Sequence, residues 1–356
     1  MDLLSYLELI QINLISIKMS NKNLLVLLLG LIFMISCSES EVVNIYSARH
    51  YDTDQQLYDG FTEETGIEIN LIEGSSDELI ERINNEGVNS PADVLITVDA
   101  GRLWRAKDAG VLQSFESNYL SEAIDSEMRD PEGYWVGLSN RVRGIVYNTE
   151  AIETGELEGY WELANDEWEG RICIRSSNNI YNQSLVASLI ERHGEEETEE
   201  WANNFVENFA RSPQGGDTDQ IRAVAAGLCD VAVVNHYYLA RLMQSDAAED
   251  QEVASQVAMY FPPVEYGGAH VNISGAGVAA NSPNEENAIR FIEYLATEEA
   301  QQYYAIANNE FPVLDGMELP DVLDEFGQFD TDGINVAAYG SNNPAAIRVM
   351  DRAGWR

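Results

Sequence analysis

The chain of 356 residues is longer than a single hydrophobic core comfortably supports, so two lobes are expected. Its hydrophobic content of 45% is ample for packed cores and excludes a disordered chain. The formal net charge of −41 disfavours binding to nucleic acid, which requires a basic surface.

The N-terminus has the pattern of an export signal. After Lys22 an apolar run at 24–35 ends directly before Ser36 and Cys37, and it is too short to cross a membrane as a helix. The small residue before Cys37 resembles a lipobox, after which bacteria attach lipid to the cysteine, although Met34 stands where that pattern prefers leucine. We expect an over-long start at 1–18, cleavage before Cys37 and a lipid anchor on it. Ordinary secretory cleavage nearby is the alternative.

The acidity persists after the signal is removed, because residues 1–36 contain two acids and two bases. Lys107 is the only lysine in the remaining chain, so arginine is strongly preferred. This composition resembles that of halophilic proteins, whose surfaces stay hydrated when salt screens charge repulsion. An acidic surface that recruits cations is the alternative, but the acids are spread along the whole chain.

The first part of the mature chain alternates strands and helices. Apolar patterns at 42–46, 67–72 and 92–97 indicate three strands. Between the first two strands, apolar residues at helical spacing predict a helix. Between the second and third strands, a capping box from Ser75 to Glu78 marks the start of another helix. The order β-α-β-α-β is typical of a doubly wound parallel sheet.

A second α/β region follows, with strands at 171–175 and 231–234, and a later strand at 270–278 returns to the first region. Without an internal repeat or a low-complexity linker, two lobes joined by strands indicate a hinged clam shell. We expect an over-long start plus signal at 1–36, lobe one at 37–137 and 264–312, and lobe two at 138–263 and 313–356.

Cys173 and Cys229 remain as a pair if Cys37 is lipidated. Export to an oxidising compartment permits a disulfide between them, and two buried free thiols are the open alternative, since both lie in or beside apolar runs. Neither has the spacing of a metal ligand.

Four of the seventeen tyrosines follow the carboxyl ends of predicted strands, where open α/β sheets bind ligands. Tyr51 lies after the first strand of lobe one. Tyr181, Tyr237 and Tyr238 follow two strands of lobe two. Closure of the hinge would therefore bring one tyrosine to three others.

These side chains suit one metal in particular. Phenolate oxygen is a hard, anionic donor that matches iron(III). A tyrosine of pKa about 10 ionises near neutrality only beside a strong positive charge, which the metal supplies. Three phenolates neutralise iron(III), and Arg241, one helical turn past Tyr238, is placed to balance a fourth. A packing role for the adjacent pair Tyr237 and Tyr238 is the alternative.

Three segments resemble the ferric-binding proteins of bacterial iron ABC transporters, also called bacterial transferrins, and especially their cyanobacterial-type branch. They are Tyr46-Ser47-Ala48-Arg49-His50-Tyr51, Ser176-Ser177-Asn178-Asn179-Ile180-Tyr181-Asn182-Gln183-Ser184 and Asn235-His236-Tyr237-Tyr238-Leu239-Ala240-Arg241. The likeness runs from about 42 to 356. It implies a two-lobed type II periplasmic binding protein that captures iron(III) outside the cytoplasm and passes it to a permease. We expect a membrane-anchored monomer without catalytic activity.

The resemblance also implies roles for single residues. The metal ligands would be Tyr51, Tyr181, Tyr237 and Tyr238. His50 is similar to a position that ligates iron in some members and swings away in others, and both possibilities stay open. Arg49 and Arg141 resemble positions that hold a carbonate-like anion in some members. For these two and for Arg241, balancing the charge beside the metal is the preferred interpretation.

Two other functions compete with iron binding. The same fold hosts binding proteins for organic anions or polyamines, but these would need an aromatic box or an arginine clamp without the paired tyrosines. An exported hydrolase or metalloenzyme is disfavoured because the sequence contains no HExxH, GxSxG or P-loop motif and only four histidines.

Overall fold

The computed structural model describes residues 41–49 and 51–356, so the expected signal segment, Cys37 and His50 lie outside the described residues. Within the described ranges, no helix is long and apolar enough to cross a membrane.

The N-terminal elements follow the predicted β-α-β-α-β order. They are β1 (Val42–Ser47), α3 (Asp54–Thr65), β2 (Glu68–Glu73), α4 (Ser76–Glu86), β3 (Val94–Val98) and α5 (Ala100–Asp108). β1 pairs in parallel with both β2 and β3, which confirms the predicted parallel sheet. The capping box is also confirmed, because Ser75 accepts from the Glu78 N–H and the Glu78 carboxylate accepts from the Ser75 N–H at 3.0 Å.

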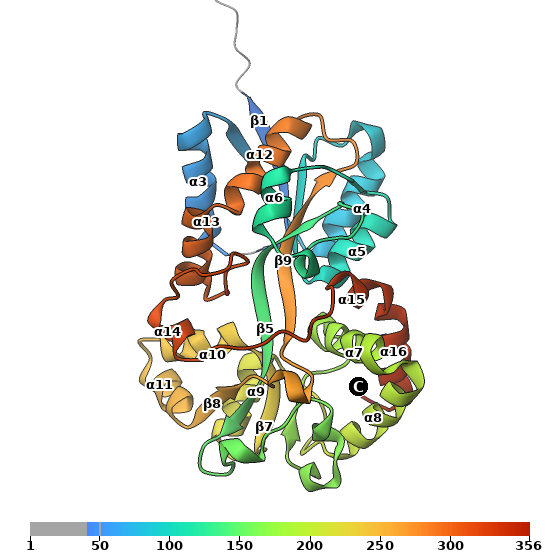
Figure 1. Cartoon of the computed structure of the whole chain (residues 1–356), viewed down its shortest axis with the longest axis vertical. Helices are drawn as coiled ribbons and strands as arrows, with labels where there is room; N and C mark the ends of the chain where they lie inside the picture. Colours follow the sequence, from blue (N-terminus) through green and yellow to red (C-terminus); the bar gives the residue numbers. More distant parts are fainter. Residues whose placement is uncertain (1–40, 50) are drawn as a thin grey trace, which may run out of the picture. The chain divides into compact units, whose positions relative to one another are not determined.

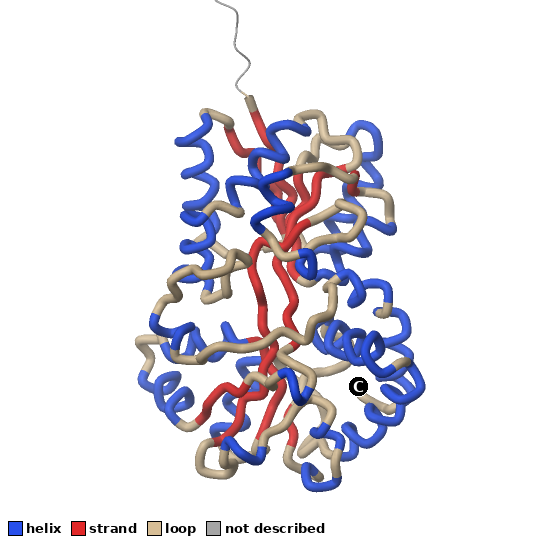
Figure 2. Tube along the Cα trace, viewed as in Figure 1, coloured by secondary structure: helices blue, strands red, loops and turns tan. Residues whose placement is uncertain are grey.

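Two long antiparallel strands, β5 (Val136–Asn148) and β9 (His270–Ala279), run through the centre of Figure 1. β9 also pairs with β3, and β5 pairs with β7 (Val231–Asn235), which pairs with β6 (Ile172–Cys173). The strand order is therefore β2-β1-β3-β9-β5-β7-β6. The strands of the first and second α/β regions are therefore parts of one hydrogen-bonded sheet, whose strands Figure 2 shows in red. The elements around β1, β2 and β3 are called the first lobe below, and those around β6, β7 and β8 the second lobe.

The second lobe alternates helices with short strands. Its elements are β6 (Ile172–Cys173), α7 (Ile180–His193), α8 (Glu195–Glu207), α9 (Asp217–Ala225), β7 (Val231–Asn235), α10 (His236–Met243), α11 (Ala248–Ser255) and β8 (Val257–Tyr260). β6 is shorter than the predicted strand at 171–175. The carbonyl of Arg175 instead accepts from the side chains of Asn182 at 2.9 Å and Trp355 at 2.8 Å, so it takes no part in the ladder.

The C-terminal part of the chain crosses between the lobes. α12 (Glu285–Leu295), α13 (Glu298–Tyr303) and a π-helical turn (Tyr304–Asn308) return to the first lobe, where α12 packs on β1, α3 and β9. Phe311 then pairs with Asn140 of β5. The last helices are α14 (Asp321–Asp324), α15 (Ala337–Ser341), which contacts α5 and α7, and α16 (Asn343–Arg352), which packs on α7 and α8. In Figure 1, α15 lies between α5 and α7.

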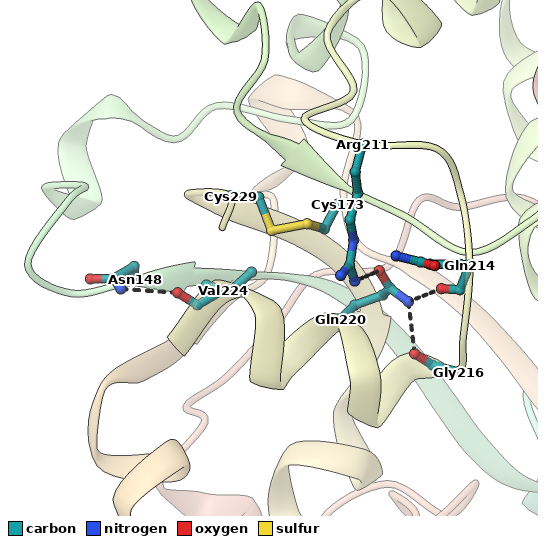
Figure 3. Close-up of a disulfide and its surroundings, with 8 residues drawn as sticks. All are labelled: Asn148, Cys173, Arg211, Gln214, Gly216, Gln220, Val224 and Cys229. Carbon is teal, nitrogen blue, oxygen red and sulfur yellow. Dashed lines mark hydrogen bonds between the residues drawn. A yellow bond between two sulfur atoms is a disulfide. The ribbon is translucent and has the colours of Figure 1, made fainter. Parts of the chain in front are cut away.

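Cys173 and Cys229 form a disulfide, with Cα atoms 5.7 Å apart. Figure 3 shows the bond between β6 and the turn that precedes β7, above α9. On the same helix, Gln220 accepts from Arg211 and donates to the carbonyls of Gln214 and Gly216, which fixes the loop that leads into α9. Of the two alternatives for this cysteine pair, the structure contains the bridge.

Candidate metal centre

The four predicted tyrosines come from three separate elements. Tyr51 lies in the loop between β1 and α3. Tyr181 is in the first turn of α7, where Asn179 caps the helix by accepting from the Tyr181 N–H at 3.1 Å. Tyr237 and Tyr238 are in the first turn of α10, which follows β7 directly. All four positions therefore follow the carboxyl ends of strands in the parallel parts of the sheet.

Arg141, near the middle of β5, brings three of these tyrosines together. One of its guanidinium nitrogens donates to the Tyr51 hydroxyl at 3.4 Å. The other donates to the Tyr181 hydroxyl at 3.1 Å and to the Tyr237 hydroxyl. The Tyr238 ring lies against Tyr237, with centroids 4.6 Å apart. The structure thus collects one tyrosine of the first lobe and three of the second around one buried cation.

Arg241 covers the same cluster from α10. Its guanidinium carbon lies 5.2 Å from the ring centroid of Tyr51, 5.1 Å from that of Tyr237 and 5.8 Å from that of Tyr238. These are cation–π distances, so Arg241 adds positive charge next to the three rings.

Arg49 lies against the Tyr51 ring and is paired with two carboxylates. Its guanidinium is 4.8 Å from the Tyr51 ring, donates to Asp54 at 2.8 Å and donates to Glu310 at 2.9 Å. Glu310 also accepts from Arg141 at 2.6 Å, so one buried carboxylate joins the two arginines.

Sequence reasoning missed Glu310. The residue follows the π-helical turn and precedes the isolated pairing of Phe311, so no strand or motif marks it. With 61 acidic residues in the chain, a single glutamate does not stand out. The only available signal is a carboxylate directly before the apolar residues of 311–314.

Sequence reasoning also missed Asn235 and Arg175. The Asn235 amide donates to the Tyr237 hydroxyl at 2.9 Å. The guanidinium carbon of Arg175 lies 5.6 Å from the Tyr181 ring centroid, and its side chain is paired with Asp217. Both hold the second-lobe tyrosines in place.

The pKa values of the tyrosines differ with their surroundings. Burial would raise the pKa of Tyr51, but the guanidinium groups of Arg141, Arg49 and Arg241 outweigh it and lower the pKa below its ordinary value. Burial raises the pKa of Tyr237 well above its usual value, with Arg141 acting in opposition. Burial, together with the nearby Tyr181 and Asp217, raises the pKa of Tyr238 to about 12. A metal ion that binds the last two phenols must therefore displace their protons.

Of the predicted site residues, Cys37 and His50 lie outside the described residues. His236, which precedes Tyr237 on α10, is buried, and both of its ring nitrogens bond to backbone groups. It donates from Nε2 to the Asn309 carbonyl at 2.8 Å and accepts at Nδ1 from the Val142 N–H at 3.1 Å. Burial lowers the pKa of His236 to about 4, so this imidazole is neutral.

Phenol oxygens are the anionic donors that the arrangement can offer. Among residues 41–49 and 51–356, no group of three or more His, Cys, Asp or Glu side chains is placed to hold a metal ion. Four phenols that can become phenolates, with arginines around them, form a hard, highly anionic donor set whose excess charge is balanced locally. Such a set matches a small trivalent cation.

Comparison with known proteins places the chain in a family. Residues 89–327 match the family described as bacterial extracellular solute-binding protein. Iron uptake protein A1 of Synechocystis is 48% identical over 318 residues, which are 89% of this chain and 88% of the relative. The Fe(3+)-binding periplasmic protein of Serratia marcescens is 30% identical and covers 90% of this chain and 92% of the relative.

A solved structure shares the fold over the same region. The Trichodesmium protein IdiA (FutA), determined in complex with iron and citrate ligands, superposes with a TM-score of 0.87. It is 55% identical and covers 88% of this chain and 100% of its own. These matches confirm the resemblance found in the sequence and the two-lobed α/β fold. The chain belongs to the bacterial extracellular solute-binding protein family, together with the iron uptake proteins of Synechocystis.

Proposed function

We propose that this protein binds iron(III) outside the cytoplasm and delivers it to the permease of an ABC transporter. The observation that carries the proposal is the cluster of four tyrosines from both lobes around Arg141. The names of the relatives support it, since they describe iron uptake and Fe(3+)-binding proteins. These relatives are solute-binding proteins, which favours a binding role over a catalytic one.

In this proposal Tyr51, Tyr181, Tyr237 and Tyr238 are the iron ligands, and His50 is an optional one. The three tyrosines of the second lobe form a partial site before closure, and Tyr51 joins them when the lobes close. Arg49, Arg141 and Arg241 balance the charge of the phenolates and make no bond to iron. Each phenol gives up its proton as it binds, because the metal replaces the proton as the positive partner of the oxygen.

The location and anchoring of the protein extend the same proposal. Cys37 lies outside the described residues, and its lipidation is supported by the apolar run at 24–35 that ends before it. We propose an exported, lipid-anchored monomer from a salt-adapted cell, with lobe one at 37–137 and 264–312 and lobe two at 138–263 and 313–356. Mass spectrometry of the native N-terminus tests the anchor, and an unmodified N-terminus elsewhere would leave only secretion.

Metal and solute selectivity test the function itself. The protein without residues 1–36 is stripped of metal, offered iron(III), iron(II), zinc, a polyamine and small organic anions separately, and its bound metal and melting temperature are measured. We expect stoichiometric iron(III) that resists a chelator, with a large rise in melting temperature because the ligand binds only the folded state. A protein that is stabilised by a polyamine or an organic anion and not by iron(III) would belong to the alternative class of binding protein.

A further inference from the structure

Four donors converge on the carboxylate of Glu310, which is completely buried. One oxygen accepts from Arg141 at 2.6 Å. The other accepts from Arg49 at 2.9 Å, from the Ser139 hydroxyl and from the Ser274 hydroxyl at 3.4 Å. Two guanidinium groups and two hydroxyls around one small anion form a complete anion cradle.

The donors and the carboxylate come from different parts of the fold. Arg49 follows β1, Ser139 and Arg141 are on β5, and Ser274 is on β9. Glu310 arrives on the crossing segment between the π-helical turn and Phe311. Without its side chain, the rest of the site would still present two buried guanidinium groups and two hydroxyls to the same space.

The backbone on either side of Glu310 is tied to the tyrosine-bearing elements. Asn309 adopts a left-handed backbone with φ of 56°, and its carbonyl accepts from His236, which is next to Tyr237. Asn308 donates to Asp54, in the first turn of the helix after Tyr51. The position of the carboxylate is therefore fixed against both the first-lobe and the second-lobe parts of the site.

The two arginines depend on Glu310 to different degrees. Arg49 keeps a second carboxylate, Asp54, at 2.8 Å. Among the described residues, Arg141 has Glu310 as its only carboxylate partner, and its other partners are the Ser274 hydroxyl and the phenols of the tyrosine cluster. Loss of the Glu310 charge therefore acts first on Arg141, and through it on the tyrosines.

We propose that Glu310 is a built-in anion of the iron site: it fills the cradle that a small external carboxylate or carbonate would otherwise occupy, so iron(III) is held without one. This inference rests on the proposed iron-binding function. Glu310 is a positioning residue in this account, since it orients and neutralises Arg141 and does not touch the metal.

The parent protein provides the first test. Its iron(III) affinity is measured by competition with a chelator in carbonate-free buffer, with and without formate or bicarbonate, and iron is supplied from the same weak complex in every arm. We expect the same affinity in all arms, because the cradle is already full. A tenfold or larger gain on adding either anion would overturn the proposal.

Two variants provide the second test. Glu310→Ala removes the carboxylate and leaves room for formate, so its iron affinity should fall by about tenfold to a hundredfold and be restored by formate. Glu310→Gln is the matched control, since its amide fills the same space without charge. It should lose affinity similarly and not respond to formate.

Other results for the two variants and the parent protein would contradict either the role of Glu310 or the proposed function. If either variant binds iron(III) as tightly as the parent protein without added anion, Glu310 is not a built-in anion. The same holds if Glu310→Ala loses iron affinity and formate does not restore it. If Glu310→Ala does not fold, the parent protein and Glu310→Gln decide the matter. A parent protein that binds no iron(III) at all would instead refute the proposed function.

Discussion

At the scale of single residues, the proposed metal centre combines side chains of opposite charge whose states depend on one another. Arg141 keeps a positive charge among the phenols of Tyr51, Tyr181 and Tyr237. Glu310 remains ionised because, although burial would raise its pKa, the guanidinium groups of Arg49 and Arg141 lower the pKa to about 2. The cluster is thus held together by charge before any metal arrives.

The tyrosines should not contribute equally to iron binding. In the proposed site Tyr51 is the one ligand that arrives by closure, so we expect Tyr51→Phe to bind iron more weakly and more labilely, with the second-lobe partial site intact. Tyr237→Phe should cost more, because it removes a proposed ligand of that partial site, leaves the Asn235 amide without its acceptor and removes one of the acceptors of Arg141. A drop of at least about tenfold in affinity is expected for each, measured by chelator competition.

Tyr260→Phe is the matched control for these variants. It removes a hydroxyl that donates to the Glu158 carbonyl at 2.9 Å, outside the tyrosine cluster, and it should leave iron affinity unchanged. Equal iron affinity in Tyr51→Phe, Tyr237→Phe and the parent protein would mean that the ligands are assigned wrongly.

Arg241→Ala should behave differently from the tyrosine variants. The guanidinium faces three phenol rings, so its loss should shift the absorption band or the affinity and leave the colour. A colourless Arg241→Ala protein that remains folded would show that the arginine is needed for the iron bonds themselves.

At the scale of elements, the sequence predicts the tyrosine set because strand ends can be located from local patterns. Tyr51, Tyr181 and Tyr237 each follow an apolar run, and the carboxyl ends of such strands are where a ligand binds. The pairing of β5 with β9 could not be predicted, since the paired residues are 127 to 140 positions apart and their register is set by tertiary packing. Glu310 was missed for the same reason, because its donors come from three distant elements.

A hydrogen bond between the lobes should contribute to iron retention. Ser184 on α7 donates to both carboxylate oxygens of Asp99, at 2.8 and 2.9 Å, and Asp99 caps α5 of the first lobe. Ser184→Ala should therefore speed iron release to a chelator by about tenfold, the value expected for losing a bond to a charged group. Ser188→Ala is the control, since within the described part of the chain that hydroxyl bonds only to the Leu185 carbonyl of the same helix. Identical iron release rates for the two variants would mean that the hydrogen bond between Ser184 and Asp99 does not help to retain iron.

The disulfide should stabilise the fold without serving the metal. Cys173 and Cys229 are 56 positions apart in the sequence, so replacing both with alanine should lower the free energy of unfolding by roughly 2–4 kcal/mol. Cys229 precedes β7 whereas Tyr237 follows it, so iron affinity at moderate temperature should be kept. Thermal melts and iron titration of the double variant measure both effects. Loss of iron from a folded double variant would connect the bridge to the site.

At the scale of the whole molecule, the net charge of −41 should make stability depend on salt. The screening length falls from about 10 Å at 0.1 M to about 3 Å at 1 M ionic strength, which relieves mutual repulsion of the acids. The melting temperature should rise steeply from dilute buffer to molar salt. A flat curve would mean that the acidity is not an adaptation to salt.

The visible absorption spectrum of the iron-loaded protein tests the central claim most directly. Phenolate bound to iron(III) transfers charge to the metal and absorbs visible light, whereas zinc or an organic solute in the same place would not. The account predicts a coloured parent protein whose band weakens or shifts in Tyr237→Phe and Tyr238→Phe, while the fold is kept by circular dichroism. A colourless iron(III)-loaded parent, or a band unchanged in all four single Tyr→Phe variants, would contradict it.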